Sequence, residues 1–245
     1  MFTPNLNGKT KRSKDLESYW HQKFEASAAF SSDADRNLAH SFGHKERLLV
    51  FKELIQKYLH PGAQSVLDVG CGSGTYFDLY DAMGLEIKGI DFSDAQIERA
   101  RKRNANAHLF AGFVEAAPDS FTADLVVSIG VVQAVSDLDL FFHSFANRVL
   151  PGGMAIVSCL NKRSIWPGSI LDPKLRFFSY STISSMLEKH FHIVDCRRFY
   201  PMPFPFSLAR PLLYKFQIPF LNHGFMFVLK PRSVALNDEG DQNLG

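Results

Sequence analysis

Short apolar runs alternate with amphipathic segments along most of the chain. Runs rich in aliphatic and β-branched residues predict strands at 65–69, 86–91, 107–112, 124–128 and 154–160. Apolar residues spaced three and four apart predict helices at 44–59, 76–83, 94–104 and 137–150. A further helix at 179–190 and strands at 191–198 and 225–229 follow. This alternation predicts one α/β domain built on a largely parallel sheet.

The first predicted strand ends at three alternating glycines, Gly70, Gly72 and Gly74. A strand that enters a helix through such a turn is expected to present free backbone N–H groups at the edge where α/β folds bind ligands. The dinucleotide pattern G-x-G-x-x-G is not met, because Thr75 stands at the third glycine position. Asp68, just before the turn, would repel a pyrophosphate and suits a ligand with an ammonium or sulfonium charge.

A second carboxylate closes the next predicted strand. Asp91 ends the run 86–91 and follows Gly74 by seventeen residues. A carboxylate accepts two hydrogen bonds from a ribose diol, so this position suits a nucleoside ligand.

The order of Asp68, the glycines and the stretch Gly89-Ile90-Asp91-Phe92-Ser93 resembles motifs I and II of the class I S-adenosylmethionine-dependent methyltransferases. The likeness runs over roughly residues 65–161 and is greatest to the small-molecule type that includes ubiquinone-pathway O-methyltransferases. It implies a Rossmann-like, doubly wound, seven-stranded, mostly parallel sheet with an antiparallel last strand and an N-terminal helical cap. It also implies S-adenosylmethionine as cofactor and S-adenosylhomocysteine as product.

The resemblance implies a set of cofactor-binding residues: Asp68, Gly70, Cys71, Gly72, Gly74, Asp91, Phe92, Gln96, Phe113, Val114, Ser128, Ile129 and Gly130. One position departs from the family. Many relatives carry an acidic residue after the glycine that ends the third strand, where it bonds the adenine amino group, whereas Phe113 follows Gly112 here. Adenine is therefore expected to rest on the Phe113 and Val114 backbone and on apolar contacts, with Glu115 a less certain partner.

The stretch after the fourth predicted strand, 129–134, is neutral and apolar. The D/N/S-P-P-Y/F tetrapeptide of amino-group methylation and the Pro-Cys pair of cytosine methylation are absent from it. We therefore expect methyl transfer to an oxygen or nitrogen nucleophile on a small apolar, aromatic or lipid-like acceptor. The expected substrate-binding residues are Tyr19, Trp20, Gln133 and Trp166.

A hydroxyl acceptor usually needs a base, for which His40 and His44 are the candidates, while His143 falls on an outer helix. Two alternatives remain open. One is methylation of RNA or protein, and the other is a non-catalytic protein that binds S-adenosylmethionine. The formal charge of +2 gives no reason to expect a nucleic-acid partner. The three scattered cysteines show neither a disulfide framework nor metal-ligand spacing, so no metal site is expected.

The chain divides into a tail and helical cap at 1–43, the methyltransferase domain at 44–232 and a flexible tail at 233–245. Within the domain, the segment 162–178 looks like an insert beside the acceptor pocket. The Pro- and Phe-rich segment 199–224 fits a lid, a peripheral membrane contact, a homodimer contact or a crossover packed on the sheet. The first fifteen residues are polar and no apolar run is long enough for a membrane span, which predicts a cytoplasmic protein.

Overall fold

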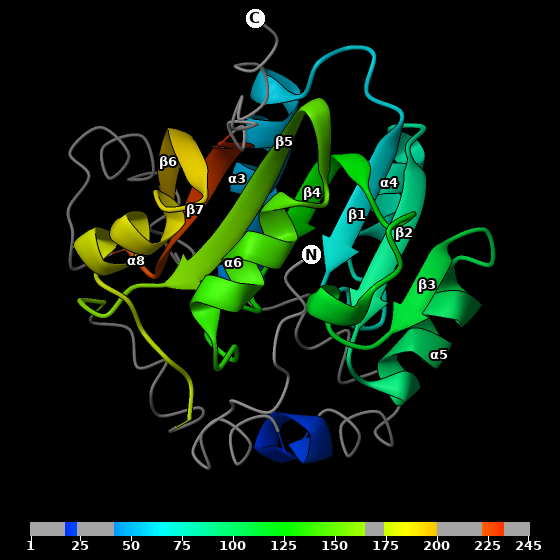
Figure 1. The fold of residues 1–245 in the computed structure, drawn as a ribbon, viewed down its shortest axis with the longest axis horizontal. Coiled ribbons are helices and arrows are strands. Elements are labelled where there is room, and N and C mark those ends of the chain that lie inside the picture. Colours follow the sequence, from blue (N-terminus) through cyan, green and yellow to red (C-terminus); the bar gives the residue numbers. More distant parts are fainter. Residues whose placement is uncertain (1–17, 24–41, 165–173, 200–221, 233–245) are drawn as a thin grey trace, which may run out of the picture.

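The computed structural model describes residues 18–23, 42–164, 174–199 and 222–232. Its centre is a seven-stranded sheet with the strand order β3-β2-β1-β4-β5-β7-β6 (Figure 1). The first five strands pair in parallel, and β7 runs antiparallel to both β5 and β6. The expected fold class is confirmed, including the antiparallel last strand.

The strands lie close to their predicted ranges: β1 Ser65–Val69, β2 Glu86–Asp91, β3 His108–Ala111, β4 Ala123–Ser128, β5 Val149–Leu160, β6 Phe191–Phe199 and β7 Gly224–Pro231. The helices are α3 Phe42–Tyr58, α4 Phe77–Ala82, α5 Asp94–Arg103, the 3₁₀ turn η1 Val114–Ala116, α6 Leu138–Ala146 and α8 Tyr180–Leu187. Every residue of β1 is buried, as a central strand covered on both faces requires.

Side-chain caps explain where three helices begin. The Ser93 hydroxyl accepts from the Gln96 N–H at α5, the Asp137 carboxylate from the Leu140 N–H at α6, and Ser179 caps α8 in the same way. Each oxygen satisfies one of the N–H groups that a first helical turn leaves unbonded.

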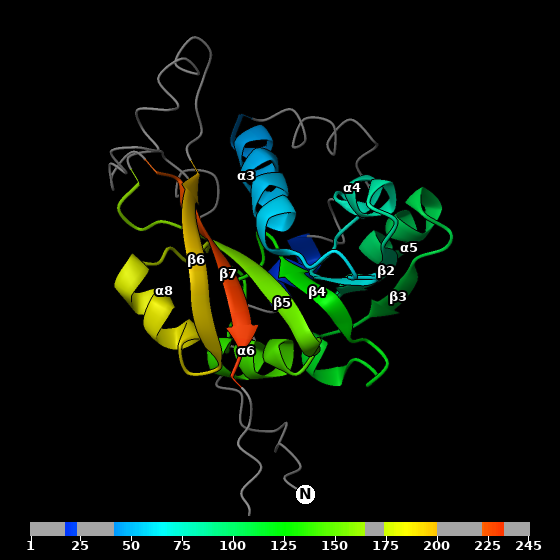
Figure 2. The same cartoon turned by 90° about the horizontal axis from the view of Figure 1, so that it is seen from above.

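Helices cover both faces of the sheet (Figure 2). One face carries α3, α4 and α5, whose side chains pack with those of β1 and β2 around Phe51, Phe77 and Ile97. The other carries α6 and α8, which pack through Phe142 and Ile183. The helical residues 18–23 lie beyond the carboxyl ends of the parallel strands (Figure 1), which is where the sequence predicted a ligand site.

The junction between α6 and β5 differs from prediction. The helix expected over 137–150 ends at Ala146, and β5 begins at Val149 rather than at residue 154. Val149 pairs with Ala123, and the next pair joins Met154 to Leu125. The residues between them, which include Pro151, therefore form a bulge inside a strand rather than a turn before it.

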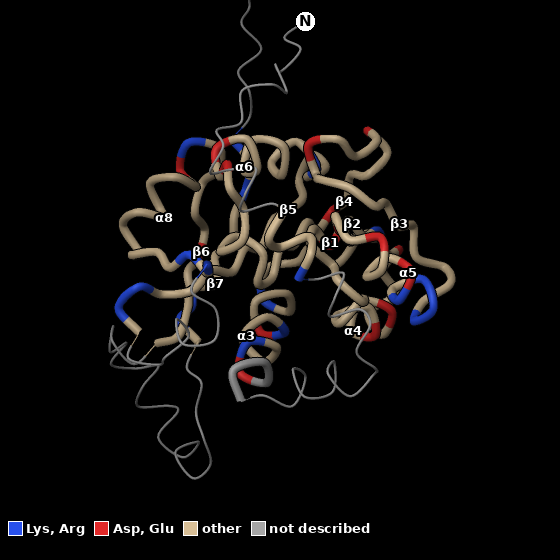
Figure 3. Tube along the Cα trace, turned by 90° about the horizontal axis from the view of Figure 1, so that it is seen from below, with Lys and Arg blue, Asp and Glu red and all other residues tan. Residues whose placement is uncertain are grey.

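Acidic and basic residues alternate along the described chain, and basic residues, drawn in blue, cluster at the last turn of α5 (Figure 3). That turn holds Arg101, Lys102 and Arg103, which suit the negative end of the helix dipole. Among the described helices, none is long and apolar enough to cross a bilayer. The expectations for 1–17, for most of the segment 199–224 and for the tail 233–245 lie outside the described residues.

Candidate active site

The glycine turn after β1 takes a backbone conformation that side chains would block. Gly70 has a φ of 79°, in the left-handed region that only glycine enters readily. A Cβ on Gly70 would lie 2.2 Å from a methyl carbon of Val131, which belongs to the turn after β4. The turn therefore requires glycine at position 70, and without a side chain there a ligand can approach the backbone closely.

The N–H groups of this turn are largely used within the protein, which differs from the expected free donors. Gly70 and Cys71 both donate to the Ile90 carbonyl, at 2.7 and 3.0 Å, and Gly74 donates to the Cys71 carbonyl. Gly72 donates to the Asp91 carboxylate at 2.9 Å. A pyrophosphate needs such donors itself, so this arrangement favours a ligand that approaches the backbone without requiring its hydrogen bonds.

Asp91 stands at the carboxyl end of β2, where it pairs with Ala111 of β3 and its carbonyl accepts from the N–H of Gly112 at 2.8 Å. One carboxylate oxygen accepts from Gly72 and the other from the N–H of Ser93 at 3.0 Å. These bonds fix the orientation of the carboxylate, and each carboxylate oxygen is able to accept more than one hydrogen bond. Asp91 can therefore both brace the glycine turn and bind a ribose diol.

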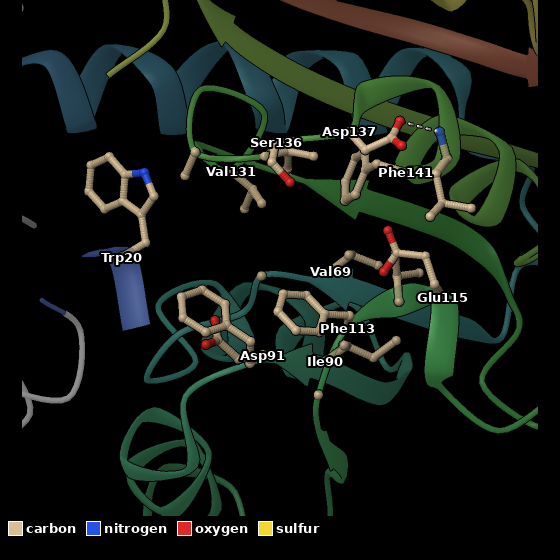
Figure 4. A pocket seen from close by; sticks show the side chains of 17 residues that line it. Trp20, Val69, Ile90, Asp91, Phe113, Glu115, Val131, Ser136, Asp137 and Phe141 are labelled. Carbon is tan, nitrogen blue, oxygen red and sulfur yellow. Dashed lines mark hydrogen bonds between the residues drawn. The ribbon is translucent and has the colours of Figure 1, made fainter. Parts of the chain in front are cut away.

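A cavity that is partly open to solvent extends from the glycine turn between the ends of β1, β2 and β4. Its walls are mostly apolar and include Val69, Phe92, Phe113, Val131 and Phe141, with Asp91 at one side (Figure 4). The rings of Phe92 and Phe113 lie nearly parallel, with centroids 5.9 Å apart. A cavity with flat aromatic walls and one diol-binding carboxylate has the chemistry of a nucleoside site.

Trp20 lines this same cavity and is buried. The ring of its neighbour His21 lies 5.9 Å from that of Phe92. We expected Trp20 and Tyr19 at the acceptor, and the structure places Trp20 in the wall of the cavity that Asp91 also lines. Tyr19 carries the Lys174 ammonium above its ring at 4.1 Å, which joins the 18–23 helix to the chain beyond residue 173.

Two carboxylates stand at the far end of the cavity, where Glu115 projects from η1 between Phe113 and Phe141 and Asp137 caps α6 (Figure 4). Glu115 therefore contributes a carboxylate to the same cavity that Phe113 lines. Arg148 holds this loop from behind, since its buried guanidinium donates to the carbonyls of Val114, Ala117 and Pro118 at 2.6 to 3.0 Å.

Asp68 is almost completely buried in β1 and accepts a hydrogen bond from the Tyr80 hydroxyl at 3.1 Å. Burial raises the pKa of its carboxyl to about 7, and the nearby Asp91 adds to this, while the Tyr80 hydrogen bond acts in the opposite direction. A cationic ligand group would favour the ionised form. The carboxylate predicted for an ammonium therefore has a raised pKa in the absence of a ligand.

Arg47 is a functional candidate that the sequence analysis missed. It lies near the start of α3, and its Nη1 atom is 3.2 Å from where a Cβ on Gly130 would be. Its charge also lowers the pKa of Tyr76, which burial raises. A helix that leads back into β1 must begin near the carboxyl edge of the sheet, so a basic residue in its first turns was the available signal. Arg47 is placed to hold a ligand carboxylate.

The remaining predicted cofactor residues fall into two groups. Gly130 borders Arg47, and its N–H donates to the Ser158 hydroxyl at 2.9 Å, beside the buried Ile129 and Ser128. Neither Cys71 nor Gln96 lines the cavity. The Cys71 sulfur lies 2.9 Å from where a Cβ on Gly89 would be, and the Gln96 Oε1 atom lies 4.0 Å from where a Cβ on Gly72 would be, beside the glycine turn.

Of the predicted acceptor residues, Gln133 is buried and donates from Nε2 to the Gly130 carbonyl at 2.6 Å. Its Oε1 atom has no hydrogen-bond partner among the described residues. Trp166 and His40 lie outside the described residues, as does the side chain of His44. His143 is on the outer surface of α6, with its ring 5.8 Å from that of His190.

Comparison with known proteins agrees with this geometry. Residues 39–199, more than half of the chain, match the model of a family described as methyltransferase domain. The chain is 29% identical over 102 residues to a ubiquinone biosynthesis O-methyltransferase of Mesorhizobium japonicum, covering 40% of this chain and 41% of that one. It is 33% identical over 139 residues to a malonyl-[acyl-carrier protein] O-methyltransferase of Serratia marcescens, covering 56% of this chain and 51% of that one. The chain thus spans about half or less of the length of these curated relatives.

A solved structure extends the likeness to the whole fold. The N-methyltransferase NodS of Bradyrhizobium japonicum, in complex with S-adenosylhomocysteine, superposes with a TM-score of 0.64 at 15% identity, covering 86% of this chain and 97% of that one. The chain therefore belongs to the methyltransferase domain family, with the fold of class I S-adenosylmethionine-dependent methyltransferases.

Proposed function

We propose that this chain binds S-adenosylmethionine and transfers its methyl group to an oxygen or nitrogen nucleophile of a small organic acceptor. The observation that carries this proposal is the pair of carboxylates around the glycine turn. Asp91 lines the cavity at the end of β2, and the buried Asp68 lies in β1, just before the turn. Together they suit a ligand that joins a ribose to a cationic amino acid.

S-adenosylmethionine supplies a methyl group on a sulfonium, whose departure as a neutral thioether makes the displacement favourable. The work left to the chain is to position the reactants and to exclude water. Asp91 would hold the ribose hydroxyls, and the rings of Phe92 and Phe113 would form an aromatic wall beside the adenine, with Glu115 at its amino group. The methionine end would lie along the glycine turn toward Gly130.

A small apolar acceptor is supported by the surroundings of the turn after β4. Val131, Val132 and Ala134 offer no charge to a polar macromolecule, and charges of both signs interleave on the described surface (Figure 3). Both curated relatives are named as O-methyltransferases of small groups, a quinone-pathway compound and a carrier-bound malonyl unit. We therefore place oxygen first among the acceptor atoms.

Calorimetric titration followed by a transfer assay tests the proposal. We expect micromolar binding of S-adenosylmethionine and S-adenosylhomocysteine and none of NAD. With methyl-labelled S-adenosylmethionine, we expect transfer to members of a panel of catechols, hydroxyquinols, amines and free or thioester-linked carboxylic acids. Labelling only of RNA or protein in the same assay would move the chain to the macromolecular class. Cofactor binding without any transfer would favour a non-catalytic role.

As part of the same proposal, the Arg47 guanidinium binds the carboxylate of the methionine part of the ligand. Replacing Arg47 with methionine should lower the affinity for S-adenosylhomocysteine about tenfold or more, because a charge-assisted hydrogen bond is removed while the aliphatic bulk is kept. Binding of 5′-methylthioadenosine, which has no amino-acid part, should not change. Lys52→Met, on the exposed side of α3, is the matched control. If Arg47→Met lowers the affinity for both ligands equally, Arg47 supports the folded structure of the site and does not bind the ligand carboxylate.

A further inference from the structure

Arg148 lies between α6 and β5, and its side chain reaches the turn that follows β3. The guanidinium donates from Nη2 to the carbonyls of Val114 and Ala117, at 3.0 and 2.7 Å, and from Nη1 to the carbonyl of Pro118 at 2.6 Å. The carbonyl of Arg148 accepts from the N–H of Ala123 at 3.0 Å, which anchors the residue at the start of β4. Arg148 is only 8% exposed, so water competes little for these bonds.

The three bonds hold the turn on both sides of Glu115. Val114 precedes this residue directly, and Ala117 follows it by two positions. The side chain of Val114 is also buried in the core, which fixes the turn from within. The backbone around Glu115 is therefore held in place, and its carboxylate projects into the cavity between Phe113 and Phe141 (Figure 4).

The charge of the guanidinium acts on the same turn. Arg148, Glu115 and Asp119 line a second hollow, which shares Glu115 with the first cavity. Burial lowers the pKa of the Arg148 guanidinium, while the charges of Asp119 and Glu115 raise it. The guanidinium and the Glu115 carboxylate therefore attract each other, and this attraction adds to the three hydrogen bonds in holding the turn.

We propose that Arg148 makes the site selective for adenine, by holding Glu115 where its carboxylate accepts a hydrogen bond from the 6-amino group of the base. Arg148 does not line the cavity, so it is a positioning residue. An ionised carboxylate accepts hydrogen bonds and donates none, so it binds an amino group and repels the oxygen that hypoxanthine carries at the same position. This inference rests on the proposed function and deepens it, because it assigns the choice of base.

Calorimetric titration with S-adenosylhomocysteine and with S-inosylhomocysteine, which has hypoxanthine in place of adenine, measures the selectivity. The wild type should bind the adenine ligand about a hundredfold more tightly. Arg148→Met should reduce this ratio to about tenfold or less, because the turn loses all three bonds to the guanidinium. Arg148→Lys should give an intermediate ratio, since one ammonium donates to carbonyls but lacks the guanidinium fork. Arg101→Met, exposed in the last turn of α5, is the matched control and should keep the wild-type ratio.

A double-mutant cycle separates positioning of Glu115 from general support of the fold. Glu115→Gln should lose the selectivity by itself, because its amide can donate to the oxygen of hypoxanthine. Adding Arg148→Met to Glu115→Gln should then lower the affinity for both ligands by the same factor and leave the ratio unchanged.

Three results would overturn the assignment of Arg148. If Arg148→Met weakens both ligands equally and keeps the wild-type ratio, Arg148 supports the fold and does not select the base. If Arg148→Met does not fold, a wild-type ratio in Arg148→Lys has the same meaning. A wild type that binds both ligands equally shows that Glu115 does not read the amino group, although the cofactor class stands. A wild type that binds neither ligand refutes the proposed function itself.

Discussion

Replacing Asp91 with alanine is expected to lower the affinity for S-adenosylhomocysteine by about a hundredfold to ten-thousandfold. Two charge-assisted hydrogen bonds to the ribose would be lost, each contributing roughly 1.5 to 3 kcal/mol. The N–H groups of Gly72 and Ser93 would also lose their acceptor, which loosens the glycine turn. Calorimetric titration of both proteins measures the change.

Asp81→Ala is the control for this variant, because Asp81 is an exposed acid at the end of α4 and lines no part of the cavity. It should bind as the wild type does. The variant should also be compared with S-2′-deoxyadenosylhomocysteine, which lacks one ribose hydroxyl and should lose affinity in the wild type but little more in Asp91→Ala. Undiminished binding by Asp91→Ala would remove Asp91 from the ribose site.

Replacing Asp68 with asparagine is expected to stabilise the ligand-free protein at pH 8 by on the order of 3 kcal/mol. Burial raises the pKa of this carboxyl to about 7 from an ordinary value of 3.8, so the folded protein binds the proton more tightly than the unfolded chain does. Its favourable contribution is therefore complete below pH 4 and is lost as the pH rises through 7. Asparagine is neutral throughout and keeps an oxygen for the Tyr80 hydroxyl.

Urea unfolding at pH 5 and pH 8 measures this difference, which should be larger at pH 8. Binding should change in the opposite direction. The ionised carboxylate attracts the ligand ammonium, so the wild-type affinity for S-adenosylhomocysteine should fall as the pH drops from 8 to 6, and the variant should bind weakly at both values. A variant no more stable than the wild type at pH 8 would show that the buried carboxyl is not held near neutrality.

If Asp68→Asn is more stable than the wild type and binds the ligand more weakly, Asp68 is a residue retained for binding at a cost in stability. Its carboxyl lies in the most buried strand of the sheet, where an aliphatic side chain would pack without desolvating a charge. Functional sites commonly tolerate such local conflicts.

The strands, the helix order and the cofactor class could be predicted from the sequence because they depend on local pattern. Periodicity places β1, β2 and most of the helices, and Asp68, Gly70 and Asp91 stand close together in a stretch with one recognisable spacing. The turn that follows a parallel strand always lies at the carboxyl edge of the sheet, so its position follows from the strand prediction alone. No long-range information is needed for these features.

What the tertiary structure decided depends on residues far apart in the chain. Arg47 of α3 meets Gly130 after β4, and Arg148 before β5 holds the turn around Glu115, although no sequence pattern links these positions. Trp20 reaches the nucleoside cavity only because helix 18–23 crosses the strand ends. Packing also decided which amides of the glycine turn are bonded internally and which carboxyl is buried. Contacts of this kind are set by how layers pack, which local periodicity does not encode.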